Sequence, residues 1–282
     1  MCRFLLYVGD PLTLGTLITE PEHSLIRQSS HSQLRSEALN GDGFGVAWYV
    51  HDISPEPARF RSFRPAWNCA NLRDIARVSR SSVVLAHVRA ASPGLEISES
   101  NCHPFAEGKL AFMHNGSIGG FLKKKRELQK PLSDRAFDSI TGSTDSELAF
   151  AHFQDFYNEL ESLAGVERLA AAMTKTIERI LSITDPDGDP SYLNFAVSDG
   201  FSAVVSKYSN TDEQPSLFLS RGRSYRCENG VCLMDKSDDT NAAIIVASEP
   251  LSLDDGWEEV PSSSLVLINA DRQVEIRPIL QP

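Results

Sequence analysis

The sequence lacks any uninterrupted apolar run of the roughly 18 to 20 residues that a membrane-spanning helix needs. The opening stretch, MCRFLLYVGDP, is too short and too soon broken to be a secretory signal peptide. Basic residues are also scarce, since 27 Lys and Arg stand against 38 Asp and Glu and leave a net charge of -11. A surface of that sign repels a phosphate backbone. We therefore expect no membrane partner, no nucleic-acid partner and a cytosolic location.

Paired cysteines at metal-binding spacing are missing as well. The five cysteines are scattered, their number is odd, and no CxxC pair is present, so the pattern of a zinc site is absent. Free thiols are the simplest interpretation. Cys227 and Cys232 flank the turn-like stretch ENGV and can approach each other across a hairpin, but two further ligands for a structural metal are lacking. We predict neither a metal nor a cofactor.

A regular alternation of strands and helices is absent too. Strand-like patterns dominate the first 118 residues, apart from a mixed segment rich in Ser and Gln and one short helix. Helical periodicity dominates residues 119–182, and short strands return from residue 192. The predicted strands cover residues 2–8, 41–50, 58–63, 81–91, 109–118, 192–200, 201–208, 216–222, 223–229 and 242–250, with a hairpin over 263–279. The predicted helices cover residues 71–78, 119–129, 145–157 and 165–182. This order favours α+β layers over a doubly wound sheet, and no repeat or linker divides residues 1–282, so we expect a single domain.

Cys2 is the first residue with a chemical argument. Removal of Met1 by methionine aminopeptidase would place a free α-amine and a thiol on one residue. A model α-amine has a pKa of about 7.7 to 8.0 and a thiol about 8.5, so the amine can take the thiol proton near neutral pH. A Met-Cys start also arises by chance, so the other motifs of the sequence must decide whether Cys2 is a nucleophile.

Three further motifs place the groups that an amide hydrolase needs. HVRAASPG contains Arg89, whose planar guanidinium suits a substrate carboxylate. HNG contains the Asn115 amide and the Gly116 N–H, which together form a plausible oxyanion hole. GSTDSE contains Asp145, an acid able to pair with an ammonium group. The set describes a site for a zwitterionic amino-acid head with an amide farther along its side chain.

Five ordered motifs resemble those of the class II glutamine amidotransferases, a family of N-terminal-nucleophile (Ntn) hydrolases. They are MCRFL, NGDGFG (40–45), HVR (87–89), HNG (114–116) and STDSE (143–147). The resemblance implies a four-layer αββα sandwich with two mainly antiparallel sheets. It also implies that Cys2 attacks a γ-carboxamide, that Asn115 and Gly116 stabilise the oxyanion, and that Arg89 and Asp145 hold the α-carboxylate and α-amino groups.

Further segments, including PEHSLIRQS, PAWN, SNCHPF and VASEPLSLDDGWEEVP, are similar to the amidotransferase-like subunits of the fungal DUG glutathione-degradation complex. That similarity implies hydrolysis of the γ-glutamyl bond of glutathione to glutamate and cysteinyl-glycine, through a thioester on Cys2. It also implies a partner, the larger peptidase-like DUG subunit. Glutamine and glutathione share the γ-glutamyl head, so the recognition residues need not differ between them.

Several alternatives remain open at this stage. Arg89 is also readable as a surface arginine at a strand end, and Asp145 as a helix N-terminal residue favoured by the helix dipole. His87 and His114 are interpreted as packed histidines that brace the site, and the NGDGFG stretch as a loop of glycines near the nucleophile. Other candidate functions are a glutaminase or glutamine amidotransferase, an ergothioneine-pathway γ-glutamyl hydrolase, and a non-catalytic subunit.

Overall fold

The computed structural model describes residues 2–32, 34, 39–91, 94, 96–184, 188–236 and 241–279. Met1 and part of the expected DPDGDP loop lie outside these ranges. One sheet has seven strands, all antiparallel to their neighbours. In spatial order they are β13 (Glu258–Glu259), β9 (Phe218–Gly222), β12 (Ala243–Ala247), β1 (Arg3–Thr13), β4 (Arg80–Val88), β2 (Phe44–Trp48) and β3 (Ala58–Ser62). The strand that follows Cys2 therefore lies at the centre of this sheet.

A second antiparallel sheet has six strands. In spatial order they are β15 (Val274–Pro278), β14 (Ser264–Ile268), β8 (Ala203–Lys207), β7 (Tyr192–Ser198), β6 (Leu110–Ser117) and β5 (Phe105–Glu107). The predicted strand that ends in HNG is β6, and it lies between β5 and β7. The predicted closing hairpin forms as β14 and β15.

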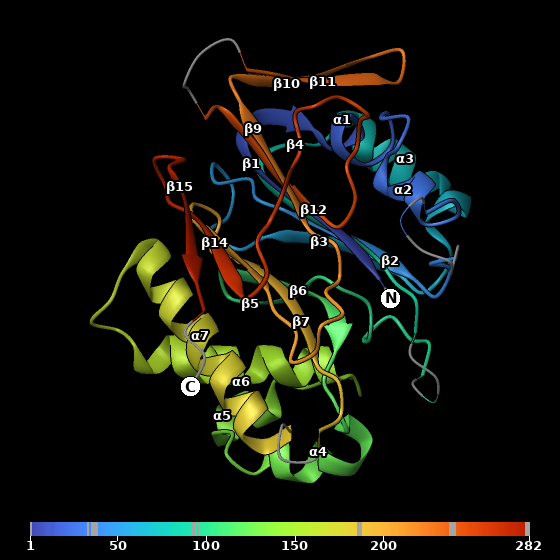
Figure 1. Ribbon diagram of the computed structural model, residues 1–282. Helices are drawn as coiled ribbons and strands as arrows, with labels where there is room; N and C mark the ends of the chain where they lie inside the picture. The colour runs from blue at the N-terminus through green and yellow to red at the C-terminus, as the bar shows by residue number, and fades with distance from the viewer. Residues whose placement is uncertain are drawn as a thin grey trace.

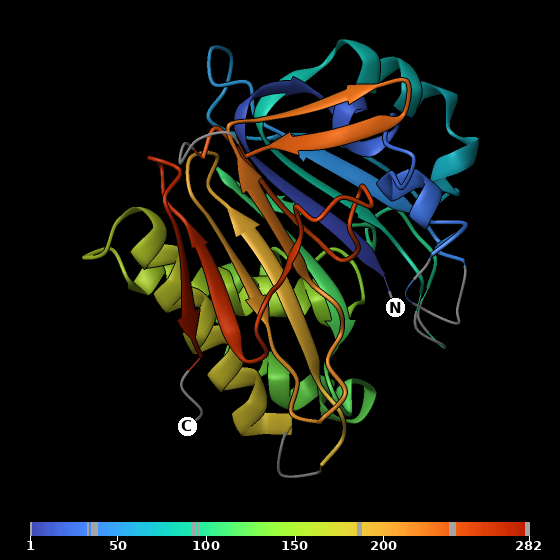
Figure 2. The same ribbon diagram turned by 45° about the horizontal axis from the view of Figure 1, so that its top comes forward.

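Helices cover the outer faces of the two sheets, as Figures 1 and 2 show. On the seven-stranded sheet lie α1 (Leu14–Ile18), α2 (Leu25–Gln28), the 3-10 turn η1 (Ala66–Asn68) and α3 (Ala70–Val78). On the six-stranded sheet lie α4 (Phe121–Gln129), α6 (Asp145–Glu159) and α7 (Gly165–Thr184), and α5 (Asp134–Asp138) packs against α6. The predicted four-layer αββα sandwich is confirmed. No helix in the described ranges combines the length and apolar character needed to cross a bilayer.

Three apolar cores hold these layers together, and β1 takes part in two of them. Phe4, Leu6 and Val8 join the core between the sheets, whereas Leu5 and Tyr7 join the core beneath the outer helices. Successive side chains on a strand point to opposite faces, so the unbroken apolar run FLLYV is what a strand buried on both faces requires. Each such side chain stabilises the fold by roughly 1.5–3 kcal/mol on full burial. Together they fix the terminus that carries Cys2.

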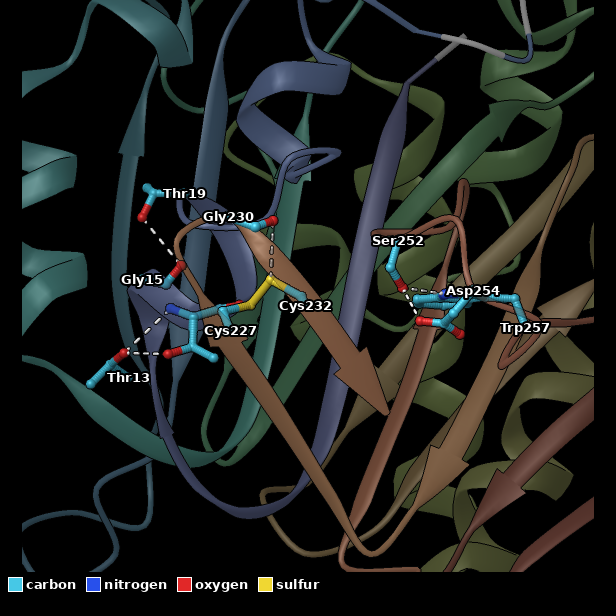
Figure 3. The surroundings of a disulfide bond; sticks show 10 residues. Thr13, Gly15, Thr19, Cys227, Gly230, Cys232, Ser252, Asp254 and Trp257 are labelled. Carbon is cyan, nitrogen blue, oxygen red and sulfur yellow. Dashed lines mark hydrogen bonds between the residues drawn. A yellow bond between two sulfur atoms is a disulfide. The ribbon is translucent and has the colours of Figure 1, made fainter. Parts of the chain in front are cut away.

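The structure corrects two expectations. The first strand does not stop at Gly9, because β1 continues to Thr13 with an irregular register against β4 between Val8 and Leu12. The expectation of free thiols is wrong for one pair of cysteines. Cys227 and Cys232 form a disulfide within the hairpin of β10 (Ser224–Glu228) and β11 (Val231–Asp235). The disulfide lies over α1, with Cys227 Sγ at 3.4 Å from the Thr16 carbonyl oxygen, and Figure 3 shows these surroundings.

Candidate active site

The register of β1 against β4 brings two predicted site residues together. Arg3 pairs with Val88, so Cys2 and Arg89 follow at the same end of adjacent antiparallel strands. The Ala90 backbone N–H lies 3.4 Å from Cys2 Sγ, and the thiol lies 3.5 Å from the Ala90 carbonyl oxygen. The side chain of Cys2 is thereby held beside the residue that follows Arg89.

Burial governs the protonation of this thiol. Cys2 is only 8% exposed, and its pKa is raised above the ordinary thiol value chiefly because burial disfavours the thiolate. The hydrogen bond from Ala90 and the positive charge of Arg89 oppose that effect, whereas the negative charge of Asp145 reinforces it. The resting thiol is therefore protonated at neutral pH, and a nucleophilic reaction at Cys2 needs a base to accept its proton.

Arg89 is buried, with 3% of its surface exposed, so the alternative of a surface arginine is wrong. Its guanidinium donates to the carbonyl oxygens of Asp42 at 3.4 Å and Glu96 at 3.2 Å. Its backbone N–H donates to Gly43 at 2.8 Å, which joins it to the NGDGFG loop. Gly43 has φ of +123°, and a Cβ there would lie 2.5 Å from the Cys102 sulfur, so this glycine is required as the motif suggested.

Asn115 reaches β1, the strand that follows Cys2, from the other sheet. Its amide nitrogen donates to the Ser248 hydroxyl at 3.1 Å, and the same hydroxyl oxygen accepts the Phe4 backbone N–H at 3.0 Å. All of these contacts are buried. An amide nitrogen carries two hydrogens, and Ser248 uses one of them. The oxyanion candidate is thus tied to a position two residues from Cys2.

Gly116 follows Asn115 where β6 passes close to β7. A Cβ at this position would lie 1.8 Å from the Tyr192 carbonyl oxygen and 2.8 Å from His114 Nε2. Both neighbours are held in the sheet, because β6 pairs with β7 from Ala111 to Ser117. The third residue of HNG is therefore glycine because two strands approach each other too closely for any side chain.

We expect Gly116→Ala to lower the free energy of unfolding by about 1–3 kcal/mol, because the added methyl must push one strand from the other. Chemical denaturation measures the change. Gly41→Ala is the matched control, since its nearest neighbour is a Trp67 ring carbon at 3.2 Å that can move. Equal stability of Gly116→Ala and the wild type would contradict the close approach.

Asp145 is the first residue of α6, whose N-terminus is capped by the Thr144 hydroxyl. Its carboxylate accepts the backbone N–H of Ile118 at 2.9 Å and that of Ser146 at 2.8 Å. Ile118 directly follows β6, so these bonds bring the helix start to the end of the strand that carries Asn115. The structure therefore gathers Cys2, Arg89, Asn115, Gly116 and Asp145 at one end of the two sheets.

The two histidines brace this end, as predicted. His87 Nε2 donates to the His114 carbonyl oxygen at 3.0 Å, which links β4 of one sheet to β6 of the other. The His114 ring contacts the Ser146 hydroxyl and the Tyr192 carbonyl oxygen, each at 2.9 Å. Both rings are buried, and burial is the main reason why their pKa values lie below that of a free histidine.

Acid should weaken this brace. Burial lowers the pKa of His87 to about 3, whereas unfolding restores about 6.5. A lowered folded pKa means that its stabilising contribution is complete above pH 6.5 and is lost as the pH falls toward 3. We expect the thermal midpoint of unfolding to fall as the pH is lowered from 6.5 toward 3. His87→Gln should make this dependence of the midpoint on pH less steep. Thermal unfolding between pH 7 and 4 measures it, with exposed His31→Gln as control; identical slopes in all three proteins would contradict the role of His87.

A cavity of about 1250 Å³ lies outside the gathered residues, between α2 and the segment 249–257. Arg27, Trp67 and Trp257 line it, and none of the five predicted site residues does. Glu249 and Ser32 connect it to the start of β1, because both line the cavity and both accept a hydrogen bond from Arg3. The five predicted site residues therefore lie outside this cavity.

Sequence reasoning assigned no role to Ser248, Glu249 or Arg3. In the structure Ser248 accepts from the Asn115 amide, Arg3 donates to the Cys2 carbonyl oxygen, and Glu249 accepts from Arg3. The motif VASEP contains Ser248 and Glu249, but it contributed only to the family resemblance and suggested no role for either residue. Single serines and buried ion pairs have no spacing signal, so only the register of β12 against β1 reveals them.

Two antiparallel sheets enclosed by helices, with a cysteine at the start of a central strand, form the architecture of the Ntn hydrolases. The chain matches the family model for class II glutamine amidotransferases over residues 21–278. It belongs to that family, and it is an enzyme that acts on carbon–nitrogen amide bonds.

Individual relatives agree with this assignment. The chain is 41% identical to "Probable glutamine amidotransferase DUG3" of Saccharomyces cerevisiae, covering 99% of this chain and 85% of that protein. It is 26% identical to the "Gamma-glutamyl-hercynylcysteine sulfoxide hydrolase" of Mycolicibacterium smegmatis, covering 99% and 100%. A class II domain protein from Silicibacter pomeroyi superposes with a TM-score of 0.66 at 25% identity, covering 98% and 99%. The glutamine phosphoribosylpyrophosphate amidotransferase of B. subtilis shares the fold, with a TM-score of 0.64 at 14% identity over 100% of this chain and 50% of that one.

Proposed function

We propose that this chain hydrolyses the γ-glutamyl bond of glutathione, releasing glutamate and cysteinyl-glycine. The observation that carries the proposal has two parts. Ala90, which follows Arg89, contacts Cys2 Sγ, and the Asn115 amide of the facing sheet is joined through the Ser248 hydroxyl to Phe4, two residues from Cys2. Similarity to DUG3 over 99% of the chain supports it. A guanidinium, a carboxylate and an oxyanion donor within one buried site suit a γ-glutamyl head.

The proposed reaction begins after removal of Met1. The free α-amine of Cys2 takes the thiol proton, and the thiolate adds to the γ-carbonyl carbon. The Asn115 side-chain amide and the Gly116 N–H hold the resulting oxyanion, while Arg89 and Asp145 hold the α-carboxylate and α-ammonium groups. The tetrahedral adduct then expels the amine of cysteinyl-glycine, which receives the proton from the α-ammonium of Cys2. Water, deprotonated by the same α-amine, cleaves the γ-glutamyl thioester and frees glutamate.

We also propose that residues 1–282 act as one domain in the cytosol, together with a larger peptidase-like subunit. The core shared by both sheets supports a single domain. Two observations suggest the partner. The chain is related to DUG3, and its sequence motifs resemble those of the fungal glutathione-degradation subunits.

A substrate comparison tests the proposal. Purified protein, alone and with the peptidase-like subunit of the same organism, is incubated with glutathione, glutamine and a γ-glutamyl thioether. Released glutamate and the leaving amine are quantified by mass spectrometry. We expect the highest kcat/KM with glutathione, by at least about tenfold, which corresponds to roughly 1.4 kcal/mol of discrimination.

Other outcomes assign other functions. Preference for glutamine with release of ammonia would identify a glutaminase or an amidotransferase that needs a synthase. Preference for the thioether would place the chain with the hercynylcysteine sulfoxide hydrolases, to which it is 26% identical. No glutamate from any substrate, with the partner present and Met1 removed, would indicate a non-catalytic subunit.

A further inference from the structure

The residues that follow β12 come level with the nucleophile. β12 runs antiparallel to β1, with Ala247 opposite Leu5, so Ser248 and Glu249 continue past Phe4 and Arg3. Ser248 donates its backbone N–H to the Phe4 carbonyl oxygen at 3.0 Å, which extends the ladder by one residue. A segment from the far end of the sequence thus flanks the start of β1.

The Ser248 side chain links the two sheets at this point. Its oxygen accepts the Phe4 N–H at 3.0 Å and the Asn115 amide at 3.1 Å, and the residue is 1% exposed. The amide oxygen of Asn115 is buried without a hydrogen-bond partner in the described structure. The bond to Ser248 is therefore the contact that sets how the Asn115 amide is rotated.

Glu249 holds Cys2 in place through Arg3. Its carboxylate accepts hydrogen bonds from Arg3 Nε and the Ser32 hydroxyl, each at 2.5 Å. Arg3 Nη1 in turn donates to the Cys2 carbonyl oxygen at 2.9 Å. The side chains of this ion pair are 2% and 4% exposed, and a buried pair with such bonds holds a single geometry. Cys2 is thereby held by its backbone while Ser248 holds Asn115.

We propose that Ser248 is a positioning residue that orients the Asn115 amide toward the adduct formed on Cys2, with the Glu249–Arg3 pair holding Cys2 in register. The inference rests on the proposed function. An oxyanion donor acts only when aimed at the developing charge, and a displacement of about 1 Å can cost 10²-fold. Ser248 acts through Asn115 and does not itself touch substrate.

A double-mutant cycle tests this role with whichever γ-glutamyl substrate the wild type accepts. We expect Ser248→Ala to lower kcat by about 10- to 100-fold with little change in KM, because the amide can then rotate away. In the Asn115→Ala background the same change should lower kcat by less than about threefold. Equal losses in both backgrounds, or no loss in either, would overturn the proposal.

Ser81→Ala is the matched control. The Ser81 hydroxyl accepts the Tyr49 N–H at 3.1 Å and donates within the same sheet, but it lies at the opposite end of β4 from Arg89. Its loss should lower the thermal midpoint without lowering kcat. A comparable fall in kcat for Ser81→Ala would mean that any buried serine of the sheet matters, and would remove the specific claim for Ser248.

A second measurement separates this inference from the proposed function. A γ-glutamyl diazoketone has the glutamyl head and the carbonyl group of the substrate, and it alkylates the thiol after binding in the same way. Iodoacetamide lacks the glutamyl head and measures only the reactivity of the thiol. Intact mass gives both labelling rates at Cys2 without any turnover. We expect Ser248→Ala to slow the diazoketone by about tenfold or more and to leave iodoacetamide unchanged. If the wild type hydrolyses none of the substrates, the proposed function fails. The role of Ser248 is still supported if Ser248→Ala slows labelling by the diazoketone more than labelling by iodoacetamide. It is rejected if Ser248→Ala and the wild type are labelled by the diazoketone at equal rates.

Discussion

Cys2→Ala should abolish glutamate release, with kcat falling by at least about 10⁴-fold. The reason is that the thioester of the proposed reaction forms on Cys2, and loss of a covalent nucleophile leaves only the rate supported by binding and oxyanion stabilisation. Quantifying glutamate after long incubation with the preferred γ-glutamyl substrate measures the residual rate. Binding of that substrate should persist, because Arg89 and Asp145 are unchanged.

The control for this prediction is Cys69→Ala. Cys69 is a free, partly exposed cysteine beside η1 and takes no part in the site, so turnover should stay at the wild-type level. The two fractions of wild-type protein with and without Met1, separated and identified by intact mass, add a second comparison. Full activity in the fraction that retains Met1 would rule out the α-amine of Cys2 as the base.

Asn115→Ala should lower kcat by about 10²–10³-fold, which is the usual cost of removing one oxyanion-hole donor and corresponds to roughly 2.7–4 kcal/mol. KM should change little, because the donor acts mainly on the charge that develops in the transition state. Steady-state kinetics with the preferred substrate give both constants. Turnover equal to that of the wild type would remove Asn115 from this role.

Asn194→Ala offers a matched control for the loss of a buried amide. Asn194 pairs with Asn115 across β6 and β7, but its amide donates to the Pro215 carbonyl oxygen at 3.4 Å. We expect that variant to lose stability and to keep kcat within about threefold. A loss as large as that of Asn115→Ala would mean that strand packing, and not the oxyanion donor, sets the rate.

The layers of the fold were predictable because their patterns are long. The run after Cys2 is apolar on both faces, and α6 and α7 each present several turns of buried side chains. The candidate site positions could be named for a related reason, since Arg89 directly follows β4 and Asn115 lies near the end of β6. The family resemblance then implied that these ends meet, and the structure places Ala90 against Cys2 and the Asn115 amide against Ser248 beside Phe4.

The rest depended on interactions that sequence patterns do not encode. α1 and α2 have five and four residues, too few to show a helical period. The turn signal Gly9-Asp10-Pro11 was overridden because β4 pairs with the chain beyond it. Ser248 bonds to Asn115 across 133 residues, and Arg3 bonds to Glu249 across 246, so only the folded register could reveal either contact.

The central place of β1 has a consequence for maturation during synthesis. β1 is completed on one side by β12, which begins at Ala243, so this neighbour is absent until most of the chain has been translated. At roughly 5–20 residues per second, that delay is on the order of 10–50 s. During the delay the edge of β1 that pairs with β12 is not yet covered, whereas in the finished sheet Cys2 is buried. The order in which the strands emerge from the ribosome thus gives the proposed removal of Met1 time to occur before the fold closes over Cys2.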